Sequence, residues 1–175
     1  MEIDLKRRMR RSVRQVDNRD WIYDVLDRAD VLSLAVSTPD GFPYVFPIRF
    51  GRDGDTIYIH SSLRGLKAEI IAVNPRVAFS TWVDVERHPR EGSTNKWKQR
   101  YRSVCGFGEA IPVTDNAGKV HAVEVIKTHY AESLVDYAID EKTLEKLLGI
   151  YAIRIEHICG RVKGYENPDK PGMKP

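Results

Sequence analysis

The sequence of 175 residues lacks any hydrophobic run as long as a membrane span, which requires roughly 20 residues. A secretory signal is also missing, because no apolar segment follows the basic residues among positions 6–11. We therefore expect a cytoplasmic protein that is not inserted in a membrane.

Cysteine occurs only twice, as Cys105 and Cys159, and this spacing excludes a CxxC motif. His157 shares an expected strand face with Cys159, but two ligands do not make a metal site. We predict no structural metal and two free thiols that are buried or half-buried.

Signatures of nicotinamide-dinucleotide and nucleic-acid binding are absent as well. No Gly-x-Gly-x-x-Gly turn follows a strand, so a resident nicotinamide site is not expected. The 28 Lys and Arg against 25 Asp and Glu give a net charge of +3, and no basic face alternates with aromatic residues. We therefore expect no bound nucleic acid.

Length and composition indicate one domain with a closed core, since 42% of the residues are hydrophobic. We assign residues 17–165 to this domain. Residues 1–16 are expected to form a basic, solvated arm, and residues 166–175 a C-terminal tail.

Apolar alternation predicts strands, and capping and breaker residues predict helices. The strands are expected at residues 31–37, 44–50, 56–60, 76–83, 101–113 and 150–162. The helices are expected after a cap at Asp17 or Asn18, over residues 64–73, after Asp115, and over roughly residues 140–148. Because strands predominate without βαβ alternation, we predict a mainly β protein, a small antiparallel barrel with peripheral helices.

Two irregular segments interrupt this pattern. Residues 84–98 are polar and predict a mobile loop, in which Trp97 could act as a lid over a shallow site. Gly106 and Gly108 interrupt a long strand, which suits a bulge or the close approach of a ligand or another backbone.

The end of the third expected strand has the composition of an anion site. His60, Ser61 and Ser62 end the strand, and Gly65-Leu66-Lys67 begins a helix. Hydroxyls, helix-start amides and the Lys67 ammonium would meet there around a phosphate, and flavin mononucleotide is the ligand most in keeping with this order. A solvated surface role for Lys67 is the alternative.

Several segments, in this order, resemble the FMN-binding split-barrel superfamily of the pyridoxamine 5′-phosphate oxidases, and within it the 5-nitroimidazole-resistance (Nim-type) group. They are Met9-Arg10-Arg11 with Arg14, Gly41-Phe42-Pro43-Tyr44-Val45-Phe46-Pro47, Ile57-Tyr58-Ile59-His60-Ser61, Gly65-Leu66-Lys67, Asn74-Pro75-Arg76-Val77, and Tyr101-Arg102-Ser103-Val104 with Gly106 and Gly108. The resemblance covers roughly residues 9–115, and beyond them only the element order matches.

The resemblance implies a six-stranded antiparallel split barrel that binds FMN, with FAD as the alternative, and a homodimer with each flavin between two subunits. The backbone at Pro47, Ile48 and Arg49 would edge the isoalloxazine. The phosphate end would be held by His60, Ser61, Ser62 and Lys67. The ring would be covered from the other subunit by Trp82, Ser103, Val104, Cys105 and Gly106.

The resemblance also suggests that His60 is catalytic, as a proton donor or a substrate contact near the flavin. A hydrogen bond to phosphate or backbone is the alternative. Arg49 and Arg102 could approach an anionic substrate or form surface ion pairs. Tyr101 and Trp82 could stack on a planar ring or pack in the core, whereas for Tyr58 we favour packing.

The function implied is an oxidoreductase that passes electrons from a reduced flavin to small planar acceptors such as nitroimidazoles. A true pyridoxamine phosphate oxidase is an alternative, weakened because Arg161-Val162-Lys163 is the only basic cluster near the C-terminus. A non-catalytic flavin- or haem-binding or storage protein is another. The last is a barrel that has lost its ligand and serves as an interaction module.

Overall fold

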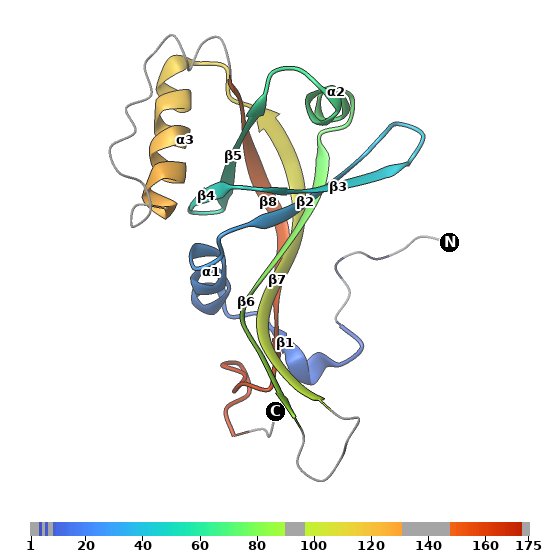
Figure 1. Cartoon of the computed structure of the whole chain (residues 1–175), viewed down its shortest axis with the longest axis vertical. Coiled ribbons are helices and arrows are strands. Elements are labelled where there is room, and N and C mark those ends of the chain that lie inside the picture. The colour runs from blue at the N-terminus through green and yellow to red at the C-terminus, as the bar shows by residue number, and fades with distance from the viewer. Residues whose placement is uncertain (1–3, 5, 7–8, 90–96, 131–147, 173–175) are drawn as a thin grey trace. The chain divides into compact units, whose positions relative to one another are not determined.

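The computed structural model describes residues 4, 6, 9–89, 97–130 and 148–172 (Figure 1). The chain separates into two compact units. Unit 1 comprises Met1–Ala29, Ser80–Cys105 and His157–Pro175, and unit 2 comprises Asp30–Phe79 and Gly106–Glu156.

The described residues form eight strands of one antiparallel sheet. The strands are β1 (Gln15–Val16), β2 (Leu32–Ser37), β3 (Pro43–Ile48), β4 (Phe50–Asp53), β5 (Thr56–Ser62), β6 (Arg76–Pro89), β7 (Trp97–Pro112) and β8 (Leu148–Lys163). Their order in the sheet is β3-β2-β6-β7-β8-β5-β4, and β1 pairs with β8 (Figure 1).

The predicted fold class, mainly β with peripheral helices, is confirmed, while the number of strands is eight rather than six. The expected strand at residues 44–50 is divided at Arg49 into β3 and β4, which pair with different neighbours, β2 and β5. The two residues of β1 are too few to show alternation in the sequence.

Among the described residues, three α-helices and a short 3₁₀-helix, η1 (Ser12–Arg14), accompany the sheet. The α-helices are α1 (Arg19–Asp27), α2 (Leu66–Val73) and α3 (Asn116–His129). The predicted caps hold: Asn18 accepts from the Trp21 amide at 2.9 Å, and Asp115 accepts from the Gly118 amide at 2.8 Å. The helix expected over residues 140–148 lies outside the described residues, except that Leu148 begins β8.

None of the helices in the described part of the chain is long and apolar enough to span a membrane.

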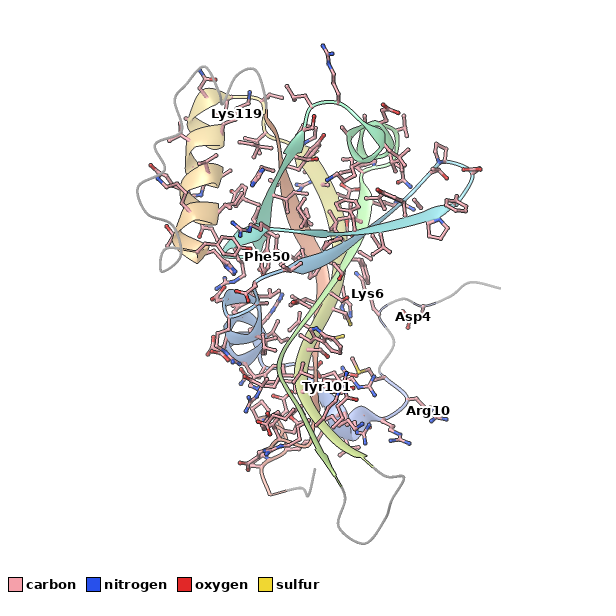
Figure 2. All side chains as sticks on the ribbon, in the orientation of Figure 1. Asp4, Lys6, Arg10, Phe50, Tyr101 and Lys119 are labelled. Carbon is pink, nitrogen blue, oxygen red and sulfur yellow. The ribbon has the colours of Figure 1, made fainter. Side chains whose placement is uncertain are left out.

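In unit 2, α3 covers β4 and β5 (Figure 1). The helix backbone approaches β4 so closely that a Cβ atom on Gly51 would lie 2.6 Å from the Val125 carbonyl oxygen. Phe50, labelled in Figure 2, is fully buried. Its ring centroid lies 4.6 Å from that of His129 of α3, and the two ring planes are tilted by 48°. Tyr58 packs on the same helix, as predicted, against Ala122 and its neighbours in a small buried cluster.

Gly108, in unit 2, lies close to another backbone, which is one of the explanations predicted for a glycine within this strand. A side chain there would collide with the Arg154 carbonyl group on β8. The glycine therefore permits the close approach of another backbone.

In unit 1, α1 buries Ile22, Val25 and Leu26. The helix also lays Trp21 against β8, where a Cβ atom on Gly160 would lie 2.5 Å from the indole. The helical period of 3.6 residues places the three buried side chains on one face of α1. The absence of a side chain at Gly160 leaves room for the indole of Trp21.

Residues near both ends of the described chain form backbone and side-chain contacts within unit 1. Gln15 and Val16, placed in the basic arm by the sequence, pair with β8. Asn167, placed in the tail, is buried, and its amide donates to the carbonyl oxygens of Val13 at 2.9 Å and Gln15 at 3.0 Å. Specific hydrogen bonds thus order residues on both sides of the expected domain boundaries.

The predicted loop at residues 84–98 is wrong in part, because β6 continues to Pro89 and β7 begins at Trp97. Residues 90–96 lie outside the described ones, as does the side chain of Trp97. Polar residues are stable in these strands because they bond to one another across the sheet. The polar composition indicated a loop, but the structure has two solvated strands here, β6 and β7, which we call the ribbon.

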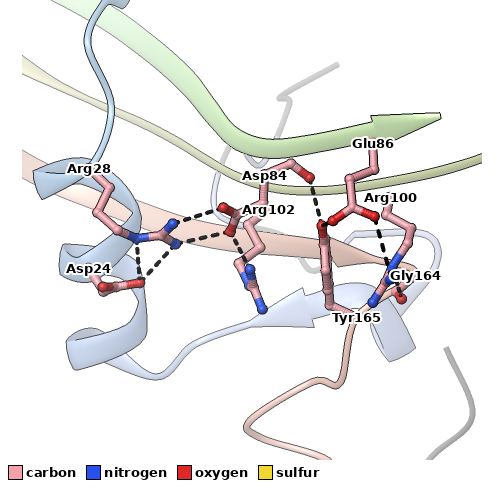
Figure 3. Close-up of polar contacts among 8 residues, drawn as sticks. All are labelled: Asp24, Arg28, Asp84, Glu86, Arg100, Arg102, Gly164 and Tyr165. Atoms are coloured by element: carbon pink, nitrogen blue, oxygen red, sulfur yellow. Dashed lines mark hydrogen bonds and ion pairs between the residues drawn. The ribbon is translucent and has the colours of Figure 1, made fainter.

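Figure 3 shows the polar network of this ribbon. Arg28, the C-cap residue of α1, binds both carboxylate oxygens of Asp84, at 2.9 and 3.1 Å, and Arg102 of β7 pairs with the same carboxylate. These guanidinium groups lower the pKa of Asp84, chiefly through the hydrogen bond from Arg28. Asp84 has a φ of +53°, so the strand departs from regular geometry where the network is anchored.

Tyr165 connects the C-terminal segment to the ribbon. Its hydroxyl lies 2.6 Å from Glu86 Oε1, to which it donates, and 3.0 Å from the Asp84 carbonyl oxygen. The guanidinium groups of Arg100 and Arg102 lie over its ring, 4.0 and 4.1 Å from the centroid. Arg102, a candidate substrate contact from the sequence, is thus engaged in a structural network.

Candidate functional site

The site begins with β5, whose alternation decides which side chains can meet a ligand. Ile57, Ile59 and Ser61 are buried on one face, while His60 and Ser62 are exposed on the other. His60 and Ser62 therefore share a face, and Ser61 points away from it. Of the two hydroxyls expected beside the histidine, the structure brings only that of Ser62 to the same face.

The chain then turns into α2 through Gly65, whose φ of +108° lies in a region that favours glycine. Ser62 Oγ accepts from the Arg64 amide at 3.2 Å and stabilises this turn. Gly65 has no side chain to cap the helix, so the first amides of α2 are not capped from that position. A helix start of this kind suits an anion.

Lys67 lies in the first turn of α2 and is half-buried. Its Nζ lies 4.8 Å from the centroid of the Phe46 ring, and Phe46 is itself buried. The contact between the ammonium and the ring restrains the lysine. Its charge is thereby held beside the helix start.

Arg49 lies at the junction of β3 and β4, and an aromatic ring supports it too. Its guanidinium lies 5.1 Å from the centroid of the Tyr130 ring. The Tyr130 hydroxyl accepts from the Phe50 amide at 3.1 Å and donates to the Asp30 carbonyl oxygen at 2.7 Å. These two hydrogen bonds fix the ring on which the arginine rests.

The electrostatics of His60 link these residues. The surrounding protein atoms lower the pKa of His60 below its usual 6.5, and the charges of Arg49 and then Lys67 lower it further. The cluster of Arg49, His60 and Lys67, which we call the basic cluster, favours a ligand of negative charge.

The other predicted residues of unit 2 are placed as follows. Pro47 is exposed on β3 and Ile48 is buried, as the alternation of that strand requires. β3 ends the strand order of the sheet, where proline is tolerated because no amide donor is needed on the outer side. Gly106 is buried on β7.

The remaining predicted residues, Trp82, Ser103, Val104 and Cys105, belong to unit 1. Trp82 is 57% exposed, so its indole does not pack in the core of this chain. Val104 is buried and Ser103 half-buried. Cys105 is exposed, which corrects the expectation of a buried or half-buried thiol: on a strand, the residue after a buried valine points to the other face.

Sequence reasoning missed the aromatic supports of the basic cluster. Phe46 and Tyr130 are distant in sequence from the cations that they support, and each was assigned only to a strand or a helix. The alternation of β3 would have marked Phe46 as inward-facing, but no pattern in the sequence pairs Tyr130 with Arg49.

Within the described ranges, no three His, Cys, Asp or Glu side chains come together as a metal site would need.

The antiparallel eight-stranded sheet with its three α-helices defines a split-barrel protein. The chain belongs to the pyridoxamine 5′-phosphate oxidase-like family, whose profile matches residues 18–162. Proteins of this family bind flavins.

Solved structures share the fold. A proposed 5-nitroimidazole antibiotic resistance protein from Bacteroides thetaiotaomicron has a TM-score of 0.75 at 22% identity, over 85% of this chain and 86% of that one. The flavocytochrome Anf3 from Azotobacter vinelandii has a TM-score of 0.75 at 19% identity, over 92% and 74%. An FAD- and heme-binding protein from Mycobacterium smegmatis has a TM-score of 0.72 at 25% identity, over 90% and 77%. Among curated proteins, none matches the sequence.

Proposed function

We propose that the chain binds FMN by its terminal phosphate and, as a homodimer, reduces small planar acceptors such as nitroimidazoles. The observation that carries this proposal is the Lys67 ammonium in the first turn of α2, which lies 4.8 Å from the centroid of the Phe46 ring. Membership of a flavin-binding family supports the cofactor. Likeness to the protein from Bacteroides thetaiotaomicron supports the choice of acceptor.

The donors of the basic cluster fit a phosphate dianion. Lys67 and Arg49 supply two charges restrained by aromatic rings, and the first amides of α2 supply neutral donors. The Ser62 hydroxyl, whose oxygen accepts from the Arg64 amide, can donate its proton to a phosphate oxygen. When bound, the flavin supplies the redox chemistry, which side chains of this kind lack.

The isoalloxazine would lie against the backbone at Pro47, Ile48 and Arg49, where the family resemblance assigns it. Trp82 and residues 103–106 from the other subunit would cover it. The indole of Trp82 is 57% exposed, so it is available to a second subunit.

His60 would accept and donate a proton beside the bound anion. Its lowered pKa keeps the imidazole neutral at pH 7, in a form that can donate one hydrogen bond. A phosphate dianion would offset the repulsion from the two cations and raise this pKa. The protonated ring could then give its proton to a reduced acceptor.

The proposal is tested by purifying the protein, recording its visible spectrum and identifying any bound flavin by mass. We expect flavin bands and FMN. After anaerobic reduction, adding a nitroimidazole should restore the spectrum of the oxidised flavin. Absence of flavin bands, even after incubation with excess cofactor, would contradict the proposal.

A second candidate is a non-catalytic flavin- or haem-binding protein that stores or delivers its ligand. It is favoured by the fold shared with a flavocytochrome and with an FAD- and heme-binding protein. The same experiment separates the two. A bound flavin that is reduced but passes electrons to neither nitroimidazoles, quinones nor oxygen at a useful rate would favour the binder.

A further inference from the structure

Two cysteines on neighbouring strands of unit 1 form a thiol pair. Cys105 lies on β7 and Cys159 on β8, strands that are adjacent in the sheet, and their Sγ atoms are 3.6 Å apart in a hydrogen bond. Cys105 is exposed, Cys159 is half-buried, and both are free thiols. In a chain whose residues 103–106 are not covered by a partner subunit, one sulfur can therefore meet a solute while the second stays within reach of it.

The face that carries this pair bears two cations, Arg161 and Lys163, together with the carboxylate of Asp17, which acts on Cys159. Alternate residues share a face of a strand, so Tyr101 lies with Cys105 on β7, and Arg161 and Lys163 lie with Cys159 on β8. The Arg161 guanidinium and the Lys163 Nζ lie 5.9 and 6.0 Å from the centroid of the Tyr101 ring, so the two faces coincide. The charge of Arg161 also acts on Cys105.

The two thiols differ in acidity, and their surroundings explain the difference. The hydrogen bond from Cys159, together with the charge of Arg161, lowers the pKa of Cys105 to about 7, although burial acts in the opposite direction. The hydrogen bond to Cys105, burial, and the negative charges of Cys105 and Asp17 raise the pKa of Cys159. An attacking thiol is most effective when its pKa is near the ambient pH. Cys105 is therefore the attacking sulfur and Cys159 the second one.

We propose that Cys105 and Cys159 form a reactive dithiol that reduces small anionic organic disulfides and closes to an internal disulfide. The Cys105 thiolate attacks one sulfur of R–S–S–R, which forms a Cys105–S–S–R bond and releases RS⁻. Cys159 loses its proton to the departing thiolate and attacks the Cys105 sulfur, which releases the second RS⁻.

This sequence of steps balances in atoms and electrons. One R–S–S–R and two protein thiols become two R–SH and one protein disulfide. Two electrons pass from the cysteines to the substrate, so no further oxidant is needed. The preference for a negative charge on R comes from Arg161 and Lys163.

The test uses the reduced full-length protein, freed of reductant, and an excess of dithiobis(nitrobenzoate), an anionic disulfide that releases a coloured thiolate. We expect two equivalents of coloured thiolate for each chain. The product should be lighter than the reduced protein by two hydrogen atoms and should carry no nitrobenzoate adduct. This measurement requires no variant, so it does not depend on whether a variant folds.

Two variants separate the roles of the sulfurs. Cys159→Ser should release one equivalent and retain one adduct, because no second thiol displaces it. Cys105→Ser should react at least about tenfold more slowly than wild type, because the remaining thiol is half-buried.

The charge preference is tested with Lys163→Gln. This variant should lower the rate with dithiobis(nitrobenzoate) by about two- to threefold, the effect expected of one exposed charge. Its rate with cystamine, a cationic disulfide, should not fall. Lys119→Gln, on α3 in unit 2, is the matched control and should change neither rate.

A wild-type product that carries two separate adducts would overturn the proposal, because the thiols would then react independently. A Cys105→Ser variant that reacts as fast as wild type would overturn it too.

Discussion

His60 shows how the properties of one side chain depend on residues that the sequence keeps apart. Arg49 precedes it at the junction of β3 and β4, and Lys67 follows it on a helix, yet both charges act on its ring. The imidazole is therefore neutral over a wider pH range than a free histidine. An anion that enters the basic cluster would change this state.

His60 therefore makes stability depend on pH in a defined direction. Because its folded-state pKa lies below the unfolded value of 6.5, its contribution is fully present above that value and is lost as the pH falls through the folded-state pKa. We expect the free energy of unfolding of wild type, relative to His60→Gln, to be highest near pH 7.5 and lower at pH 5. Urea unfolding of both proteins across this range measures it. A difference that stays constant with pH would contradict the lowered pKa.

The sequence predicted the cations of the site better than their supports. Lys67 and His60 are marked by a strand end and a helix start, which are local signals. The rings of Phe46 and Tyr130 meet Lys67 and Arg49 only through tertiary packing, which local periodicity does not encode. Ser61 was grouped with His60 because of adjacency in sequence, whereas alternation along β5 turns the two side chains to opposite faces.

Among the elements, the ribbon of β6 and β7 depends most on charged contacts. Asp84 is its centre, since it accepts from both Arg28 and Arg102 while only 26% of its side chain is exposed. The polar composition that predicted a loop here is the same property that supplies these cross-strand partners. Composition alone does not distinguish a polar loop from a polar strand, because it does not show which residues of other strands lie opposite.

Replacing Asp84 by Asn should lower the free energy of unfolding by about 1 kcal/mol, because asparagine tolerates the positive φ but lacks the charge. Asp24→Asn is the matched control. Its carboxylate pairs with Arg28 within one helix and is 56% exposed, so only a few tenths of a kcal/mol are expected. Denaturant unfolding at low and high salt measures both, and salt should reduce the effect of Asp84→Asn. An equal loss in the two variants would contradict the central role of Asp84.

The packing of α3 on β4 depends on Gly51. Gly51→Ala places a methyl group 2.6 Å from the Val125 carbonyl oxygen, so strand and helix must separate. We expect a loss of about 1–3 kcal/mol in the free energy of unfolding. Gly149→Ala on β8 is the control, because its Cβ would meet the Tyr151 side chain at 3.3 Å, which can move. Thermal unfolding compares them, and a Gly51→Ala protein as stable as wild type would show that the helix is not held this closely.

At the scale of the whole molecule, the proposed function requires two copies of the chain. The family resemblance assigns Trp82 and residues 103–106 to the flavin of the other subunit, and the exposure of Trp82 agrees with a partner there. We expect a dimer of about 40 kDa, twice the 20.1 kDa chain, by sedimentation. Each dimer should bind two flavins. A monomer that binds one flavin with unchanged affinity on dilution would contradict the shared site.

The central claim is that the basic cluster holds the phosphate of a flavin, and one comparison tests it most directly. FMN and riboflavin differ by that phosphate, so the ratio of their dissociation constants measures its contribution. We expect wild type to prefer FMN, and Lys67→Ala to reduce this ratio by roughly 10- to 100-fold, as loss of a charge-assisted hydrogen bond would. Lys119→Ala, a lysine near the start of α3, should keep the wild-type ratio (Figure 2). An FMN-to-riboflavin ratio that Lys67→Ala leaves unchanged would contradict the account.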